Sequence, residues 1–381
     1  MCTNYDTMKK LAVIGASYLQ LPVVKKAKEM GIEVHCFAWR EGAVCADVAD
    51  YFYDISTIDK EAILKECQRI GIDGIVTIAS DVAVLTVNYV ATHMQLQGND
   101  DSYSEVVTNK FRMRECFLQH AIPSPKFCRV KGASDIDAVK TFRFPVIVKP
   151  TDRSGSRGVE KVLTIDQLPE AIDRAMNESF AHEAIVEEFV EGREISVECI
   201  SWQGQHHLLQ ITDKVTTGEP YFVELEHHQP TTLPADIVGK IKTIVPQALD
   251  ALHIRYGASH SEIKITPDGE LFFIEIGARM GGDFIGSDLV RLSTGYDFLQ
   301  GVIEVALGDF HEPQLTSGHY SGVYFLSAET AWLQPMIEHA ADMPEVVEAE
   351  ITDATLRHIE SSSDRSGYLI YQSTKGRLSL R

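Results

Sequence analysis

Two glutamates in the last third of the chain combine residue types and spacing that suit a hard cation. Glu262 and Glu275 lie in the segments HSEIKI and FFIEIGAR, among apolar neighbours where an unpaired carboxylate is costly. The intervening Asp268-Gly269 dipeptide predicts a hairpin turn, so two strands would place the carboxylates face to face. Such a pair suits Mg²⁺ that bridges nucleotide phosphates, and Mn²⁺ takes the same ligands.

Arg279 follows Glu275 by four residues, in the glycine-rich run GARMGGD at residues 277–283. A guanidinium at this point is placed to stabilise charge on a transferring phosphoryl group or on an acyl phosphate. The alternative is a structural salt bridge. The first interpretation makes Arg279 a candidate catalytic residue beside the metal.

A buried lysine and a loop of small residues lie upstream. Lys149 ends the apolar strand FPVIVKP, where a buried stem would hold its ammonium against an anion. The next residues, TDRSGSRG at 151–158, form a loop whose backbone N–H groups would close over phosphate oxygens. Lys110, early in a predicted helix, is a second candidate cation, and the alternatives are a surface lysine and an ordinary hairpin loop. The loop residues expected to bind phosphate are Ser154, Gly155, Ser156 and Gly158.

The segment AIVEEFVEGREIS follows at residues 184–196. Its extended stretch, from Glu187 through Glu188 and Phe189 to Val190, leaves a buried strand and could give a purine base its backbone donor and acceptor. Glu194 could then accept hydrogen bonds from ribose hydroxyls. The alternative is an edge strand with solvated glutamates.

The elements that must position these residues alternate at first between strand and helix. Strands are predicted at residues 9–16, 32–39 and 72–80, and helices at 21–31 and 59–71, a pattern typical of a parallel sheet with helices on its faces. The turn after the first strand has one of the three glycines of a dinucleotide fingerprint, which disfavours a nicotinamide site. The polar stretch at residues 97–105 is expected to be a loop near a domain boundary.

The pattern then changes to short strands around single helices. A helix is predicted at residues 108–121 and another at 165–177, and the expected fold there is α+β with a small antiparallel sheet. A strand-rich tail follows residue 313. The strands predicted in this part are at residues 126–130, 144–150, 158–162, 184–190, 194–201, 261–267 and 270–277.

Composition excludes several classes of protein. The 381 residues carry a net charge of −20, which argues against a nucleic-acid partner because such binding rests on Lys and Arg. The start of the chain is polar and no run is long enough to span a membrane. Seven scattered cysteines without a C-x-x-C pair favour reduced thiols and a cytoplasmic location. Dimers are common among enzymes of this size, so a homodimer is an open expectation.

Four motifs in a fixed order resemble those of the ATP-grasp superfamily. They are TNKFRMRE, FPVIVKPTDRSGSRGV, VEEFVEGREIS and HSEIKITPDGELFFIEIGARMGGD, and the resemblance covers almost the whole chain. It implies an α/β and α+β fold with an N-terminal pre-ATP-grasp (Rossmann-like) parallel-sheet domain at residues 1–106. An ATP-grasp domain would follow at 107–312, with a mobile lid at about 125–195. A small strand-rich C-terminal domain would occupy residues 313–381.

The resemblance also implies roles for single residues. Lys110 and Lys149 correspond to phosphate-binding lysines, residues 152–158 to a mobile glycine-rich loop, and residues 187–190 to the adenine hinge. Glu194 corresponds to the ribose ligand. Glu262 and Glu275 correspond to ligands of one or two magnesium ions, with Arg279 beside the reacting phosphate. One departure is Gly277, where many members carry an asparagine that completes the metal site.

Within the superfamily the chain is most similar to L-amino acid ligases and to biotin-carboxylase-like carboxylate–amine ligases. The similarity implies that ATP phosphorylates a carboxylate and that an amine then attacks the acyl phosphate, with release of ADP and phosphate. His227 is implied as a catalytic and substrate-binding residue, and the other expected substrate contacts are His260, Arg279, Gly281 and Gly282.

Two alternatives stay open. One is a ligase of the phosphoribosylglycinamide or carbamoyl-phosphate type, which shares the nucleotide half and differs in the acceptor pocket. The turn at residues 16–20 and the Ser80-Asp81 loop after the third strand would line that pocket, and neither shows a basic cluster for a ribose phosphate. The other is a nucleotide-binding protein without catalysis, which the presence of Lys149, Glu262 and Glu275 disfavours.

Overall fold

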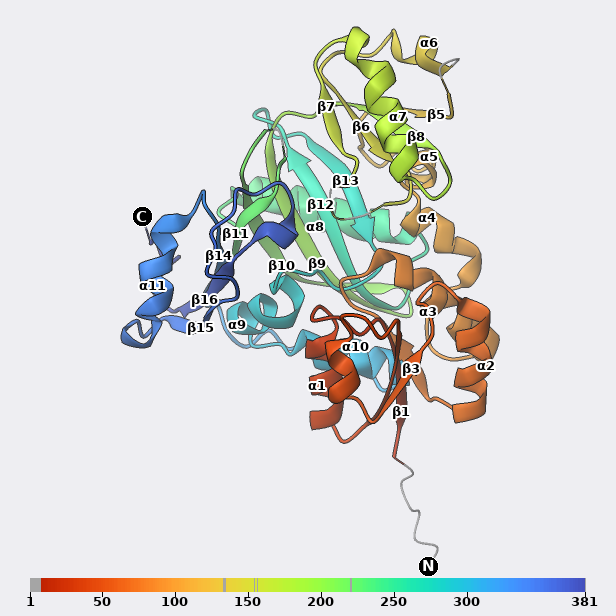
Figure 1. Cartoon of the computed structure of the whole chain (residues 1–381), viewed down its shortest axis with the longest axis vertical. Coiled ribbons are helices and arrows are strands. Elements are labelled where there is room, and N and C mark those ends of the chain that lie inside the picture. The colour runs from red at the N-terminus through yellow and green to blue at the C-terminus, as the bar shows by residue number, and fades with distance from the viewer. Residues whose placement is uncertain (1–7, 133–134, 154, 156, 220, 381) are drawn as a thin grey trace, which may run out of the picture.

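Three β-sheets organise the part of the chain that the structure describes, which comprises residues 8–132, 135–153, 155, 157–219 and 221–380. The structure is a computed structural model. Figure 1 shows the N-terminal sheet and its helices at one end, a second small sheet at the other, and the largest sheet between them. The C-terminal segment lies at the side of the largest sheet. This arrangement confirms the expected combination of a parallel N-terminal sheet with antiparallel sheets.

The N-terminal sheet is parallel, with strand order β3-β2-β1-β4. Its strands are β1 (Lys10–Ile14), β2 (Glu33–Ala38), β3 (Tyr51–Asp54) and β4 (Gly74–Val76), and its helices are α1 (Leu21–Glu29), α2 (Lys60–Ile70) and α3 (Asp81–Met94). The predicted elements β1, α1, β2 and α2 are confirmed. Two elements were not predicted, namely β3 and α3.

The prediction of a Ser80-Asp81 loop was wrong for its second residue. Ser80 stands at the N-cap position and Asp81 is the first residue of α3. The helix was missed because its sequence, DVAVLTVNYVATHM, is rich in β-branched residues, which disfavour a helix in isolation. Tertiary packing overrides that preference, since α3 buries Ala83, Val84 and Val90.

The small sheet near the top of Figure 1 is antiparallel, with strand order β5-β8-β6-β7. Its strands are β5 (Phe127–Val130), β6 (Val146–Pro150), β7 (Glu160–Val162) and β8 (Ala184–Glu188). Helix α7 (Leu168–Glu178) buries Leu168, Ala171 and Ile172 in the same hydrophobic cluster as these strands, and α6 (Ile136–Val139) is a single turn. The strand predicted at residues 194–201 lies outside this sheet.

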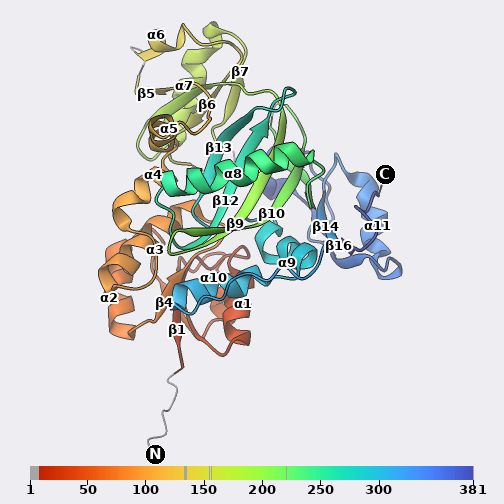
Figure 2. The same ribbon diagram turned by 180° about the vertical axis from the view of Figure 1, so that it is seen from behind.

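The largest sheet has the order β13-β12-β9-β10-β11-β14-β16-β15 and all of its pairings are antiparallel. Helix α8 (Ala235–Ala251) covers one face, as Figure 2 shows from behind. The last three strands in this order come from the C-terminal segment, so that segment continues the sheet. The strands are β9 (Arg193–Trp202), β10 (Gln205–Thr216), β11 (Glu224–Gln229), β12 (Gly257–Ile265), β13 (Leu271–Gly277), β14 (Tyr320–Leu326), β15 (Val346–Ile351) and β16 (Gly367–Ser373).

The remaining α-helices of the described residues lie between the strands along the chain. They are α4 (Ser104–Thr108), α5 (Lys110–Gln119), α9 (Val290–Thr294), α10 (Phe298–Leu307) and α11 (Gln334–Glu338). The stretch at residues 97–105 was expected to be a loop, and part of it is helical, because a 3₁₀ turn at Asp101–Tyr103 leads into α4.

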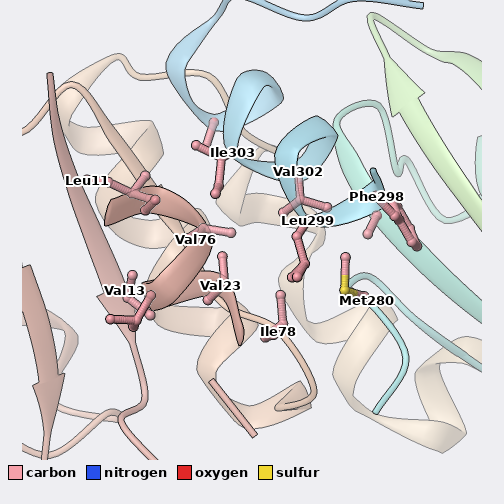
Figure 3. Close-up of a cluster of buried hydrophobic side chains, with 14 of the residues drawn as sticks. Leu11, Val13, Val23, Val76, Ile78, Met280, Phe298, Leu299, Val302 and Ile303 are labelled. Atoms are coloured by element: carbon pink, nitrogen blue, oxygen red, sulfur yellow. The ribbon is translucent and has the colours of Figure 1, made fainter. Parts of the chain in front are cut away.

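Helix α10 joins the N-terminal sheet to the rest of the molecule. Figure 3 shows Leu299, Val302 and Ile303 of α10 facing Val23 of α1 and Val76 of β4. Each such fully buried aliphatic side chain contributes roughly 1.5–3 kcal/mol. The N-terminal sheet is therefore held firmly at the edge of the site described below.

None of the helices in the described parts of the chain combines the length and the apolar character needed to cross a bilayer.

Candidate active site

Glu262 and Glu275 stand opposite each other on β12 and β13, in register across the antiparallel pair. The hairpin turn predicted between them is present, and Thr266 N donates to Glu270 O at 3.0 Å. A bulge follows Glu262. Each carboxylate is held by a different lysine, with Lys110 Nζ 2.7 Å from Glu275 Oε1 and Lys214 Nζ 2.9 Å from Glu262 Oε1.

Lys110 is the first residue of α5, and the Asn109 side chain caps that helix by accepting from two backbone N–H groups. The Lys110 ammonium also donates to Arg153 O at 2.7 Å, and its own N–H donates to Thr151 O at 2.7 Å. Lys110 thus links β13 to the start of the loop that follows β6. Only 6% of the residue is exposed, which disfavours the surface-lysine interpretation.

The base of that loop is anchored by polar contacts. Asp152 accepts from Phe180 N at 3.2 Å and from Ala181 N at 2.8 Å. Gly155 and Gly158 have φ values of +71° and +68°, which glycine adopts without strain. Two expected phosphate ligands, Ser154 and Ser156, lie outside the described residues.

A buried triad of charged residues lies beneath the loop. Glu187 on β8 is 2.7 Å from Lys149 Nζ and 2.7 Å from Arg114 Nε, and at most 5% of any of the three is exposed. Burial opposes ionisation of Glu187, but Arg114 and then Lys149 outweigh it and lower the pKa. Burial dominates at Lys149 and lowers its pKa. Arg114 was missed, although its spacing of four from Lys110 puts both on one face of α5.

The Glu187 side chain is therefore occupied in this state, and so are two backbone donors of the expected adenine hinge. Glu188 N donates to Lys126 O at 2.9 Å, and Phe189 N donates to Pro145 O at 3.1 Å. Any base contact would fall to the remaining groups, Val190 among them. The adenine hinge stays a prediction.

Lys214 lies at the centre of three carboxylates. Its Nζ is 2.6 Å from Glu194, 3.2 Å from Glu224 and 2.9 Å from Glu262. One oxygen of each carboxylate lies within 4.8 Å of the others, a spacing that could hold a metal ion. Burial lowers the pKa of Lys214, but Glu194 and the other two carboxylates outweigh it and raise the pKa well above 10.5. Lys214 and Glu224 were missed, because the sequence gives no sign that β10 and β11 follow β12 and β9 in the same sheet.

Glu194 therefore shares a cation with the expected metal ligand Glu262. That proximity is compatible with a ribose contact and also with a metal contact.

His260 is buried against Glu198, with 2.6 Å between Nδ1 and Oε1. Burial lowers the pKa of His260, but Glu198 outweighs it and raises the pKa to about 9. A Cβ at Gly281 would lie 2.7 Å from His260 Nδ1. A Cβ at Gly282 would make only an ordinary 3.5 Å contact with the Cβ of Ala79. Gly281 thus leaves room for the imidazole.

Arg279 is held by Asp81 from helix α3 in a two-point ion pair. Arg279 Nε lies 2.8 Å from Asp81 Oδ1, and Nη2 donates to Oδ2 at 2.9 Å. Burial opposes ionisation of Asp81, but Arg279 outweighs it and lowers the pKa. A Cβ at Gly277 would lie 2.8 Å from Asp81 Oδ1 and 3.0 Å from Arg279 Cζ. The ion pair therefore fills the space that a side chain at position 277 would need.

His227 is 1% exposed, and its Nε2 lies 3.6 Å from Asp283 Oδ2. Within the described residues, neither ring nitrogen makes a hydrogen bond. Burial lowers the pKa of His227, with Asp283 acting in the opposite sense. The ring is therefore neutral at pH 7, and His227 stands opposite Lys214 in the pairing of β10 with β11.

The structure thus brings the expected site residues into one region between the small sheet, the largest sheet and α3. Glu275 pairs with Lys110, Glu262 with Lys214 and Arg279 with Asp81, and Lys149 lies on the neighbouring sheet. The residues that sequence reasoning missed are partners of these groups, namely Arg114, Glu198, Lys214, Glu224 and Asp283, while Asp81 was expected only to line an acceptor pocket.

Comparisons with known proteins, by sequence and by structure, find ligases among the similar proteins. Residues 142–288 match the model of the ATP-grasp domain. The chain is 26% identical to alanine–anticapsin ligase of Bacillus subtilis over 245 residues, which cover 58% of this chain and 51% of that protein. It spans about half to two thirds of the length of the first curated relatives that it matches.

Two solved structures are similar over nearly the whole chain. The L-amino acid ligase from Bacillus licheniformis has a TM-score of 0.79 at 22% identity, covering 96% of this chain and 93% of that chain. The phosphoribosylglycinamide synthetase from Anaerococcus prevotii has a TM-score of 0.76 at 20% identity, covering 96% and 94%. At these identities the likeness shows a shared fold.

Proposed function

Because this chain is an ATP-grasp protein, we propose that it is an ATP-dependent ligase that joins a carboxylate to an amine through an acyl phosphate. The observation that carries the proposal is the pair of opposed glutamates, Glu262 and Glu275, each neutralised by a lysine. Two carboxylates that lie close to lysines and to Arg279 suit the binding of a polyphosphate together with its metal ion.

The phosphate end of the nucleotide would lie between β6 and the hairpin of β12 and β13. Lys110 and Lys149 would neutralise its oxygens, and both are already oriented by carboxylates, Glu275 and the buried Glu187. Backbone N–H groups of the loop at residues 151–158 would cover the phosphates. These roles are proposals that rest on the positions of the side chains.

The donor set fits a hard divalent cation, because the carboxylates of Glu262 and Glu275, with Glu194 and Glu224 nearby, supply only oxygen. Bound Mg²⁺, as one ion or two, would draw charge from the phosphate oxygens, and Mn²⁺ would fit the same ligands. Lys110 and Lys214 would then give up their contacts with the carboxylates and turn toward phosphate. The steric exclusion of a side chain at Gly277 removes one ligand from a second metal.

The proposed reaction has two steps. A carboxylate oxygen attacks the γ-phosphorus of ATP, the bond to the ADP oxygen breaks, and an acyl phosphate forms. An amine nitrogen then attacks the acyl carbon, phosphate leaves and the nitrogen loses a proton. Arg279 would stabilise charge on the phosphoryl group, and positioning with electrostatics would provide most of the rate.

His227 and His260 differ in what they can contribute. The neutral His227 can accept or donate a hydrogen bond to a substrate, because its ring nitrogens have no partner in the described parts of the chain. His260 is charged and tied to Glu198, which suits it to position Glu262, 3.6 Å away. Gly281 and Gly282 would let a substrate approach the backbone beside these rings.

We also propose a cellular location and an assembly state. A cytoplasmic enzyme agrees with the free thiols, since Cys36, Cys45, Cys67, Cys116, Cys128 and Cys199 are unpaired in the structure. A homodimer is supported by a solved biotin carboxylase domain of similar fold that is a dimer. Small-molecule carboxylate and amine substrates are the expected partners.

The test is ADP release with Mg²⁺ and ATP across a panel of amino acids, single and paired, together with bicarbonate and phosphoribosylamine. A Glu275→Gln variant serves as the control. Release that needs two amino acids and is lost in the variant supports a carboxylate–amine ligase. Release with bicarbonate or phosphoribosylamine alone moves the assignment to the carbamoyl-phosphate or phosphoribosylglycinamide type. Nucleotide binding without release on any substrate supports a protein without catalysis.

A further inference from the structure

Arg365 brings a cation from the C-terminal segment to the edge of the Lys214 cluster. It follows a 3₁₀ turn at Ser362–Asp364 and precedes β16. Its Nη1 lies 2.9 Å from Asp283 Oδ2, while Nη2 donates to Glu224 O at 2.9 Å and lies 3.3 Å from Glu224 Oε2. Since Glu224 also contacts Lys214, the guanidinium directly contacts one member of the carboxylate cluster.

The hydrogen-bonding capacity of this corner is not satisfied by the protein. The Arg365 side chain is 9% exposed, and its Nε has no partner within the described residues. The same holds for both ring nitrogens of the buried His227, beside the same Asp283 oxygen. Unmet donors and acceptors in a buried place are costly, so their concentration here points to a polar ligand.

The backbone of this corner is also strained. Asp283 and Phe284 follow the two glycines with φ values of +53° and +63°, a region that residues with side chains seldom adopt. This conformation turns the Asp283 carboxylate toward Arg365 and His227, while Phe284 lies 4.4 Å from the Tyr368 ring, centroid to centroid. Strained residues cluster at sites that bind ligands.

The charges define the chemistry of the ligand. Arg365 is stacked over the Phe325 ring at 3.8 Å, which fixes the plane of its guanidinium. A guanidinium so fixed can bind a carboxylate through two parallel hydrogen bonds. The two carboxylates beside it, Asp283 and Glu224, leave one negative charge in excess, which favours an ammonium group in the same ligand.

We propose that Arg365 and Asp283 determine substrate specificity by binding a zwitterionic α-amino acid, its carboxylate on Arg365 and its ammonium on Asp283. The inference rests on the proposed ligase function and names one substrate of that site. A carboxylate held by Arg365 is not the one that reacts with ATP, so this amino acid is the amine partner. Its two charges would replace the direct contact between Arg365 and Asp283.

The experiment is calorimetric titration of the full chain with the proteinogenic amino acids and with their amides, which lack the carboxylate charge. Each titration is made with and without ADP and Mg²⁺. At least one amino acid should bind about ten- to hundredfold more tightly than its amide, the usual worth of a hydrogen bond to a charged group. Arg365→Met should abolish that preference, and Arg365→Lys should retain part of it.

Arg377→Met is the matched control. Arg377 is also a C-terminal arginine that pairs with a buried aspartate, Asp213, and donates to Pro230 O at 2.9 Å, and this variant should keep the preference for the free amino acid. Absence of any preference in the wild-type chain, or its persistence in Arg365→Met, overturns the inference. If Arg365→Met does not fold, an unchanged preference in Arg365→Lys overturns it. Failure to bind ADP would count against the ligase function alone, because the titrations without nucleotide still decide the role of Arg365.

Discussion

Asp81 and Arg279, which are 198 positions apart in the chain, form a two-point ion pair whose nearest atoms are 2.8 Å apart. The pair connects helix α3 of the N-terminal sheet to the loop that follows β13. It lies against the backbone of Gly277, where a Cβ would come within 3.0 Å of both side chains. The N-terminal part of the molecule thus fixes a residue that is expected to act on the phosphoryl group.

A side chain at position 277 should disturb this pair. Gly277→Ala is expected to lower kcat/KM for ADP release by roughly tenfold, since a loss of about 1.4 kcal/mol corresponds to that factor. The loss should be strongly non-additive with Asp81→Ala, because both changes act on the same Arg279. The measurement is kcat/KM for the two single variants and the double variant.

The control is Gly239→Ala in α8, where an added Cβ meets nothing within 4 Å. It should leave kcat/KM unchanged. Purely additive losses for Gly277→Ala and Asp81→Ala would show that the two positions act independently.

Removal of the Lys214 ammonium should make the chain dependent on a divalent cation. Without it, the partly buried carboxylates of Glu194, Glu224 and Glu262 repel one another, which destabilises the folded chain. In Lys214→Met, the midpoint of thermal unfolding should fall in the presence of chelator. Excess Mg²⁺ should restore it by more than it stabilises the wild-type chain, because ligand binding to the folded state adds stability.

Lys240→Met serves as the control for this measurement, because Lys240 is a lysine in an exposed contact with Gly269 O. Its response to Mg²⁺ should equal that of the wild type. An equal Mg²⁺ response in Lys214→Met would argue that the three carboxylates do not bind the metal.

The buried triad predicts a pH-dependent contribution to stability. The pKa of Glu187 is lowered below its ordinary 4.5, so its contribution is complete above pH 4.5 and is lost as the pH falls through the folded-state pKa. Glu187→Gln should therefore lower the free energy of unfolding by about 3 kcal/mol at pH 7. The difference from wild type should shrink below pH 4.5, as measured by urea unfolding.

An exposed ion pair gives the comparison. Glu160 pairs with Arg174 on the surface of the small sheet, and such pairs are worth at most about 1 kcal/mol. Glu160→Gln should therefore have a small effect at every pH. A Glu187→Gln difference that persists undiminished to pH 3 would mean that another group carries the acid sensitivity.

The loop at residues 151–158 should close when nucleotide binds. We expect MgATP to slow amide hydrogen exchange in this segment by roughly tenfold or more, because closure protects backbone groups and excludes water. Exchange in β1 should not change. Equal exchange with and without MgATP would contradict the role of the loop as a lid.

The sequence predicts those parts of the site that depend on residues close together in the chain. The hairpin of β12 and β13 follows from alternating apolar residues around Asp268-Gly269, and the opposition of Glu262 to Glu275 follows from its length. The elements β1, α1, β2 and α2 follow from periodicity and glycine positions in the same way. Helix α3 was missed because its β-branched residues favour a strand, and only packing against α2 and the N-terminal sheet makes the helix stable.

By itself, the sequence determined which side chains carry charge and which short segments position them. The tertiary structure alone decided how those charges are paired. Arg114 with Glu187, Asp81 with Arg279, Lys214 with three glutamates and Arg365 with Asp283 each join residues from different elements. No local pattern specifies such partners, because a buried charge is matched by whichever opposite charge the folded strands and helices bring within a few ångströms of it.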